Sequence, residues 1–208
     1  AAYALLAYQT GYLKANYPVF FMAALLTSEK QNTDKVVQYL SSCKGMGLEV
    51  LPPDINESEL DFAVVGEKIR FGLAAVKNVG VSAIESILAA RQKCGRFGSP
   101  ADLCEEVDLR LVNKRVLESL VKSGSFDAFG ARRAQLAAVV DRALDYGQQV
   151  QRERESGQGN LFGDMGGVRR SPELDRLPDV PEWSESELLA NEKATLGFFL
   201  SGHPLDAY

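Results

Sequence analysis

Residues 72–91 read GLAAVKNVGVSAIESILAAR, and residues 111–130 read LVNKRVLESLVKSGSFDAFG. Each stretch joins an apolar-periodic helix to a tight turn that contains glycine, at Asn78-Val79-Gly80 and at Ser123-Gly124-Ser125. Helical periodicity beside such a turn is typical of a helical hairpin. Two such units in about sixty residues predict a pair of helix-hairpin-helix motifs.

These hairpins are suited to bind an anion, because a turn with a left-handed residue exposes backbone N–H groups where a helix begins. Two features support a DNA phosphate as that anion: a lysine stands at the edge of each turn, and the spacing of Ser82 and Glu85 predicts a capping box. The expected DNA contacts are Lys77, Asn78, Gly80 and Ser82 in the first hairpin, Lys122, Gly124 and Ser125 in the second, and Arg110, Lys114 and Arg115 as neighbouring charge. The alternative is a pair of ordinary connections within a helical core.

The two turns differ in sequence. The first has Asn78 where a glycine is common in such motifs, and asparagine tolerates positive φ better than most residues. The second contains a single glycine. We therefore expect the first turn to keep its geometry and the second to be the weaker phosphate site.

Charge is distributed unevenly along the chain, whose formal net charge is −5 over 208 residues. Residues 68–133 contain 12 basic and 7 acidic side chains, whereas residues 1–67 contain 4 and 8 and residues 134–208 contain 7 and 13. The excess of basic charge coincides with the hairpins. This is the local pattern expected of phosphate binding, with acidic flanks as solvated or partner-facing surfaces.

The remaining pattern is mostly helical. Apolar periodicity predicts helices over residues 1–16, 20–26, 113–122 and 131–151, and caps predict three more, beginning near Asn32, Ser99 and Ser184. Two further segments are exceptions. Residues 48–56 are expected to be extended, and residues 61–72 to form a small β-hairpin around Gly66. The predicted fold class is therefore mostly α with one β-hairpin.

Residues 152–181 are rich in glycine, proline and charge, which predicts a flexible linker. One short sequence within it, Gln158-Gly159-Asn160-Leu161-Phe162, combines an amide with an apolar pair. Such a peptide can insert its leucine and phenylalanine into a pocket on a partner protein. The alternative is that the pair packs back onto its own chain.

Three classes of site or location receive no support. Cys43, Cys94 and Cys104 are odd in number and lack metal-ligand spacing, which argues against a zinc site or a disulfide framework and favours a reducing cytoplasm. The longest apolar run, residues 19–26, is shorter than half a membrane span. The chain begins without Met inside an apolar helical pattern, so we expect a piece of a larger protein.

The sequences AAYALLAYQTGYLKANYP, LPPDIN, IRFGLAAVKNVG, NKRVLESLVKSGSFDAFG and LGFFLSGHPLDAY together resemble the bacterial DNA polymerase III alpha subunits, the family C replicative polymerases. The resemblance covers essentially the whole chain in order. It implies the end of a fingers domain over residues 1–60, a tandem helix-hairpin-helix domain over 61–151, a linker over 152–182, and a segment over 183–208 that leads to the next domain.

The resemblance also implies partners and chemistry. Family members carry a sliding-clamp-binding peptide after the hairpins, which Gln158, Leu161 and Phe162 match. They bind primer-template DNA and other replisome subunits, and they extend primers with Mg²⁺ held by aspartates of a palm domain, which would precede residue 1. This chain is therefore expected to contain no catalytic residue and no cofactor of its own. On resemblance alone, Tyr8, Gln9 and Lys14 face the nucleotide side of the fingers, or are ordinary helix surface.

Two other functions remain open. One is a stand-alone, sequence-independent DNA-binding module of a repair or uptake protein. Against it stands the buried apolar helix predicted within residues 1–60, which such a module does not need. The other is an interaction scaffold, in which the linker peptide binds a partner and the hairpins are only structural. Replacing Gly80 and Gly124 by bulky β-branched residues separates these alternatives. A DNA-binding protein would lose DNA affinity, whereas a scaffold has none to lose and would keep binding its partner.

Overall fold

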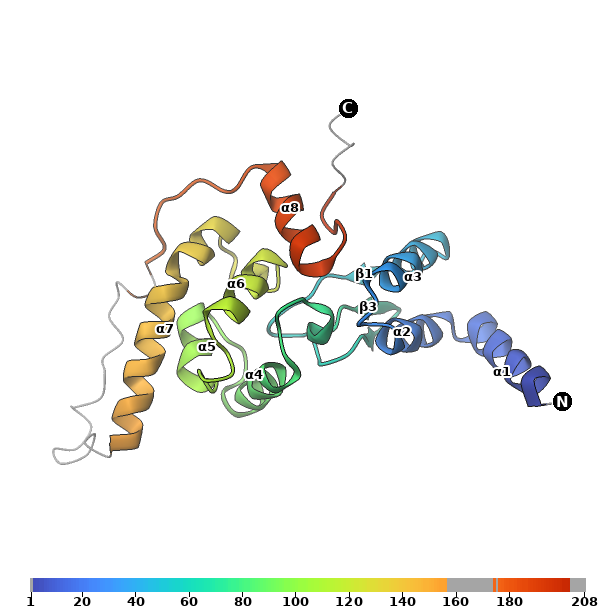
Figure 1. Ribbon diagram of the computed structural model, residues 1–208, viewed down its shortest axis with the longest axis horizontal. Coiled ribbons are helices and arrows are strands. Elements are labelled where there is room, and N and C mark those ends of the chain that lie inside the picture. Colours follow the sequence, from blue (N-terminus) through green and yellow to red (C-terminus); the bar gives the residue numbers. More distant parts are fainter. Residues whose placement is uncertain (1, 157–173, 175, 203–208) are drawn as a thin grey trace.

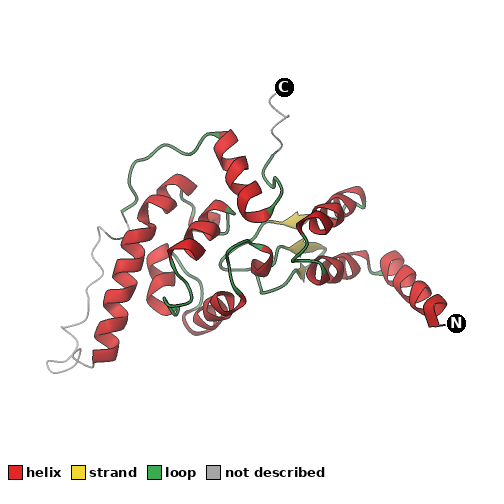
Figure 2. Ribbon diagram, in the orientation of Figure 1, coloured by secondary structure: helices red, strands yellow, loops and turns green. Residues whose placement is uncertain are grey.

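The computed structural model describes residues 2–156, 174 and 176–202 (Figure 1). Helices dominate this part of the chain, with a small sheet near its centre (Figure 2). In chain order the elements are α1 Ala2–Asn16, α2 Pro18–Ser28, α3 Thr33–Gly45, β1 Val50–Leu51, β2 Ala63–Val65, β3 Lys68–Arg70, the 3-10 helix η1 Leu73–Ala75, α4 Val81–Cys94, α5 Pro100–Glu106, α6 Lys114–Lys122, the 3-10 helix η2 Asp127–Phe129, α7 Arg133–Ser156 and α8 Glu185–Leu196. The mostly helical fold class is confirmed.

Several helix starts lie where their capping residues predict them. Asn32, Ser99 and Ser184 each accept a hydrogen bond from the backbone N–H three residues later, which satisfies an otherwise unpaired donor. The capping box predicted at Ser82 is wrong. Helix α4 begins at Val81, with Gly80 as its N-cap two residues before Ser82, and no side chain caps it.

The sheet has the strand order β1-β3-β2. Strands β2 and β3 pair antiparallel around Gly66, which confirms the predicted hairpin. Strand β1 pairs in parallel with β3, with Val50 opposite Ile69. The sequence predicts an extended segment over residues 48–56. Two of its residues form the third strand, and the chain turns at residues 55–56.

A single hydrophobic core connects α2 to the end of α8. Phe71, which is fully buried beside the sheet, contacts Phe62 edge-on at 4.6 Å between ring centroids and Phe198 at 5.7 Å. Met22 and Leu26 of α2 belong to the same core, so residues from both sides of the predicted boundary at 60 and 61 share it. The division into domains stays a prediction.

Helices α5 and α7 pack closely, and Gly147 permits this approach. A Cβ atom at that position would collide with the backbone carbonyl of Cys104. Gln151 also reaches across to α5, where its side-chain amide donates to the carbonyls of Cys104 and Val107. Helix α7 is thereby fixed as the support for the second hairpin.

Helix α1 differs from its prediction as an amphipathic helix with a packed face. It extends from α2 at the edge of the molecule (Figure 1), and every side chain from Tyr3 to Asn16 is exposed. Tyr8 is 70% exposed. The apolar side chain of Val37, on α3, is also 40% exposed. None of the helices in the described part of the chain is both long and apolar enough to cross a bilayer.

Candidate nucleic-acid interface

The first hairpin consists of η1, a turn through residues 76–80, and α4. Asn78 has φ of 66° and is the one non-glycine residue with positive φ among those described. The prediction that asparagine adopts the left-handed conformation here is confirmed. The hairpin's first helix, η1, is a single 3-10 turn.

The start of α4 presents unpaired backbone donors to solvent. Gly80, Val81 and Ser82 are exposed, and no described atom accepts a hydrogen bond from their N–H groups. The first bond at this end runs from the N–H of Ile84 to the carbonyl of Gly80 at 3.1 Å. Donors at a helix start, together with the helix dipole, favour an anion.

Two cations stand beside these donors. Lys77 is exposed and has no carboxylate within ion-pair distance in the described part of the chain. Asn78 accepts a hydrogen bond from Arg115 Nη2 at 2.7 Å and donates to Ser119 Oγ at 3.3 Å. The left-handed asparagine thus orients Arg115 of α6 toward the first turn. The structure brings Lys77, Asn78, Gly80, Ser82 and Arg115 together.

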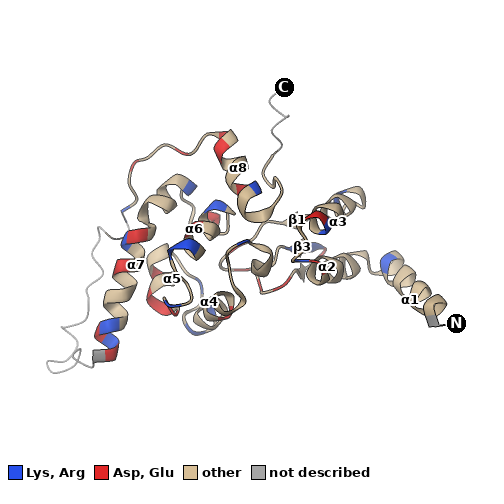
Figure 3. Cartoon of the chain, viewed as in Figure 1, with Lys and Arg blue, Asp and Glu red and all other residues tan. Residues whose placement is uncertain are grey.

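The other predicted cations near α6 are engaged by acids. The side chain and the backbone N–H of Arg110 both donate to the carboxylate of Asp108. These hydrogen bonds, the side-chain one first, lower the pKa of Asp108 to about 2. Lys114 Nζ lies 2.7 Å from an Asp141 oxygen, and this hydrogen bond raises the pKa of the lysine. Basic and acidic residues alternate along α7 in the same region (Figure 3). Arg110 and Lys114 therefore present less net charge than their number indicates.

The turn of the second hairpin is closed. Gly124 has φ of 81°, but its N–H donates to the carbonyl of Val121 and that of Ser125 donates to the carbonyl of Leu120. Ser123 and Ser125 are fully buried, with their hydroxyl oxygens 2.8 Å apart. Ser125 is thus positioned to stabilise the turn, and neither it nor Gly124 presents a donor to solvent.

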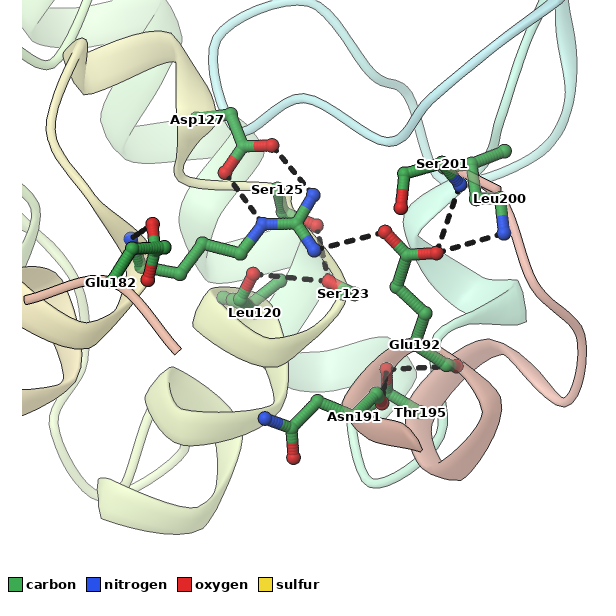
Figure 4. Close-up of polar contacts among 11 residues, drawn as sticks. Leu120, Ser123, Ser125, Asp127, Glu182, Asn191, Glu192, Thr195, Leu200 and Ser201 are labelled. Carbon is green, nitrogen blue, oxygen red and sulfur yellow. Dashed lines mark hydrogen bonds and ion pairs between the residues drawn. The ribbon is translucent and has the colours of Figure 1, made fainter. Parts of the chain in front are cut away.

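Arg133 covers this turn with an internal ion-pair network (Figure 4). Its guanidinium donates to both oxygens of Asp127, at 2.9 and 2.7 Å, and to Glu192 Oε1 at 2.9 Å. A Cβ atom on Gly124 would collide with this guanidinium. Glu192 is fully buried, and its second oxygen accepts from the N–H groups of Leu200 and Ser201.

The carboxyl group of Glu192 is charged in this network. Burial raises the pKa of Glu192, but the hydrogen bonds from the backbone of Ser201 and Leu200 and from Arg133 outweigh it, so the pKa lies below its ordinary value. Thr195, on the same helix, accepts at its carbonyl from the N–H of Lys77 at 2.8 Å. Helix α8 therefore contacts both hairpins.

The remaining predicted site residues lie apart from this interface. Lys122 is half-buried at the end of α6. Tyr8, Gln9 and Lys14 are exposed along α1. Gln158, Leu161 and Phe162 lie outside the described residues. In the described part of the chain, no three His, Cys, Asp or Glu side chains gather closely enough to hold a metal ion.

Sequence reasoning missed the acids that close the second hairpin. One signal was available for Glu192, which shares a helical face with Leu189 and Leu196, and a carboxylate on an apolar face requires a partner. No comparable signal marks Glu182. Its carboxylate accepts from the N–H groups of Arg133 and Ala134 at 2.8 and 3.0 Å, contacts that span 49 and 48 residues of sequence.

Comparison with known proteins identifies the same region. A family model described as a helix-hairpin-helix motif matches residues 47–136. The whole chain is 47% identical to part of the DNA polymerase III subunit alpha of Neisseria meningitidis serogroup B, and 46% identical to part of that of Deinococcus radiodurans. The subunit of Saccharopolyspora erythraea is 46% identical over 99% of the chain. The chain spans 16 to 18% of the length of these relatives.

Proposed function

We propose that this chain, which belongs to the DNA polymerase III alpha subunit family over the section that it spans, binds the backbone of duplex DNA for a replicative polymerase. The observation that carries the proposal is the uncapped start of α4 beside Lys77 and Arg115. Backbone N–H groups and cations bind phosphates without reading base edges, so the grip is independent of sequence.

The first hairpin can hold one strand at neighbouring phosphates. The donors of Gly80, Val81 and Ser82 converge on one oxyanion, and the exposed Ser82 hydroxyl can add a further bond. Lys77 and Arg115 then neutralise charge on either side. This assignment keeps five of the ten DNA contacts proposed from the sequence in one site, while Gly124 and Ser125 support the second hairpin.

The test is binding of the chain to fluorescently labelled duplexes of unrelated sequence, measured by anisotropy at low salt. The duplexes should bind with equal affinity, and single-stranded DNA of the same length should bind more weakly. A preference of tenfold or more for one sequence would contradict a grip made through the phosphate backbone. Absence of binding to any DNA would favour the scaffold alternative.

Nucleotidyl transfer belongs, in this proposal, to the longer protein. Two-metal transfer requires a cluster of carboxylates that holds Mg²⁺. The described residues offer no such cluster. We assign Mg²⁺ and the catalytic aspartates to a section that this chain does not span, and we assign the chain itself no catalytic residue.

The second partner we propose is a sliding clamp, bound through Gln158, Leu161 and Phe162. We place this interaction in the cytoplasm, where other replisome subunits are further partners. The support is the sequence match of this peptide to the clamp-binding form, with its two apolar anchors intact. An apolar pair inserted into a pocket carries most of the affinity of such a short peptide.

Replacing Leu161 and Phe162 together by Ala is expected to abolish clamp binding, because both pocket-filling side chains are lost. The measurement is surface plasmon resonance against an immobilised bacterial sliding clamp. Val168→Ala, in the same stretch of chain, is the matched control and should bind like the unchanged protein. Retention of full binding by the double variant would rule out this peptide as the clamp contact.

A further inference from the structure

The start of α7 already holds an anion, and that anion belongs to the chain itself. Glu182 Oε2 accepts from the N–H of Arg133 at 2.8 Å (Figure 4). Glu182 Oε1 accepts from the N–H of Ala134 at 3.0 Å. These are the first two residues of a 24-residue helix. The corresponding donors of α4, in the first hairpin, are unpaired and exposed. The two hairpins therefore differ at the anion position: in the second hairpin it is occupied by the carboxylate of Glu182, and in the first hairpin no described residue occupies it.

The segment that delivers Glu182 lies along α7, and we call residues 176–183 the strap. Three side chains of α7 or its approach hold the strap by its backbone carbonyls. Arg132 Nη1 donates to Val180 at 3.1 Å, Gln135 Nε2 to Pro178 at 2.9 Å, and Arg142 Nη2 to Arg176 at 2.7 Å. These bonds are largely exposed and therefore individually weak. Asp179 of the strap lies 3.9 Å from the Arg132 guanidinium, whereas Glu182 is the strap residue whose carboxylate accepts from the backbone N–H groups of the helix start.

The charge of Glu182 is stable in this position. Burial raises the pKa of its carboxyl, but hydrogen bonds from the backbone of Ala134, Trp183 and Arg133 outweigh burial and set the pKa below its ordinary value. The Arg133 guanidinium, the nearest cation, is directed to Asp127 and Glu192. While the strap is in place, Glu182 occupies the N–H groups of Arg133 and Ala134.

We propose that Glu182 substitutes for a DNA phosphate, so that the strap closes the second hairpin and its release opens the start of α7 to the duplex. The inference rests on the proposed function of the first hairpin and extends it to regulation of the same grip. The strapped chain holds DNA through one hairpin, and the released chain holds it through two. A phosphate and a carboxylate bind the same two N–H groups, so they compete directly.

Glu182→Gln tests this, because it removes the charge and keeps the size of the side chain. The readout is the slope of log affinity for duplex DNA against log salt concentration. A further phosphate contact steepens this slope by about 0.9. Glu185→Gln is the matched control, since it removes the same charge from an exposed position in the first turn of α8. The expected result is a steeper slope for Glu182→Gln alone.

Equal slopes for the two variants would overturn the inference, because charge removal alone would then explain any gain in affinity. A second variant covers the case in which Glu182→Gln disturbs folding. Gln135→Ala removes the hydrogen bond that holds the strap at Pro178, together with the one that Gln135 Oε1 accepts from the N–H of Arg132, without changing any charge. It should steepen the slope in the same direction. An unchanged slope for Gln135→Ala in a protein with intact circular dichroism would count equally against the strap.

The first-hairpin variant Gly80→Val separates this inference from the proposed function. With the first hairpin blocked, Glu182→Gln should restore measurable binding at low salt, and Glu185→Gln should not. If the unchanged protein binds duplex DNA through the first hairpin and Glu182→Gln alters nothing, only the inference fails. If no variant binds DNA, the proposed function fails with it.

Discussion

Gly80→Val lowers the affinity of this chain for duplex DNA by about 30-fold, because an isopropyl group then covers the unpaired N–H groups at the start of α4. Loss of charge-assisted hydrogen bonds to one phosphate costs roughly 2 kcal/mol, which corresponds to this factor. The fold should tolerate the change, since a Cβ atom at Gly80 meets no atom within 4 Å and its φ is −73°. Anisotropy with a labelled duplex at low salt measures the effect.

Gly45→Val is the control for this experiment. Gly45 is also exposed and without neighbours around a Cβ atom, but it lies at the end of α3, away from the hairpin. Its affinity should equal that of the unchanged protein. Equal losses in the two variants would mean that the start of α4 is not the phosphate site.

Glu192→Gln lowers the free energy of unfolding by about 3 kcal/mol, which is the second large effect that we expect. The change breaks a buried ion pair by removing one partner, and such losses are among the most destabilising in proteins. Arg133 then loses the charge of Glu192 and keeps that of Asp127, and the N–H groups of Leu200 and Ser201 lose a charged acceptor. Urea unfolding followed by circular dichroism measures the change.

The same variant should flatten the acid limb of the stability curve. The pKa of Glu192 is lowered in the folded chain, so its stabilisation is fully present above the unfolded pKa of about 4.3 and is lost as pH falls through the folded value. The unchanged protein should therefore lose more stability below about pH 4 than Glu192→Gln. Glu187→Gln, an exposed acid on the same helix, should keep the acid sensitivity. Identical acid limbs for Glu192→Gln and the unchanged protein would exclude this network as their origin.

Local signals in the sequence predicted much of this fold. Ser99 and Ser184 predict helix starts because their hydroxyls accept hydrogen bonds from the backbone N–H groups three residues later. Asn78 predicts a left-handed turn because asparagine tolerates positive φ better than most residues. Such signals act within four residues, so they can be read without knowing the tertiary structure. The Ser82 prediction failed because Gly80 starts the helix without a side-chain cap.

Contacts between distant residues could not be predicted in the same way. The sequence offers two similar hairpins, and nothing within residues 111–130 shows that Glu182 and Glu192 close the second one. The orientation of Arg115 by Asn78 also spans 37 residues. Each depends on where α6, α7 and α8 pack. The sequence thus predicted the residue types of the candidate site and the conformation of its first turn. The structure adds that the first hairpin has unpaired donors at its helix start and that the second hairpin is closed.

The salt dependence of duplex binding tests the central claim most directly, because it counts phosphate contacts. With the first hairpin open and the second closed, the slope of log affinity against log salt should be about −2 to −3, at roughly −0.9 for each contact. Gly80→Val should bring the slope closer to zero by about one contact. A slope near zero, or the same slope in both proteins, would contradict a grip on DNA through the first hairpin.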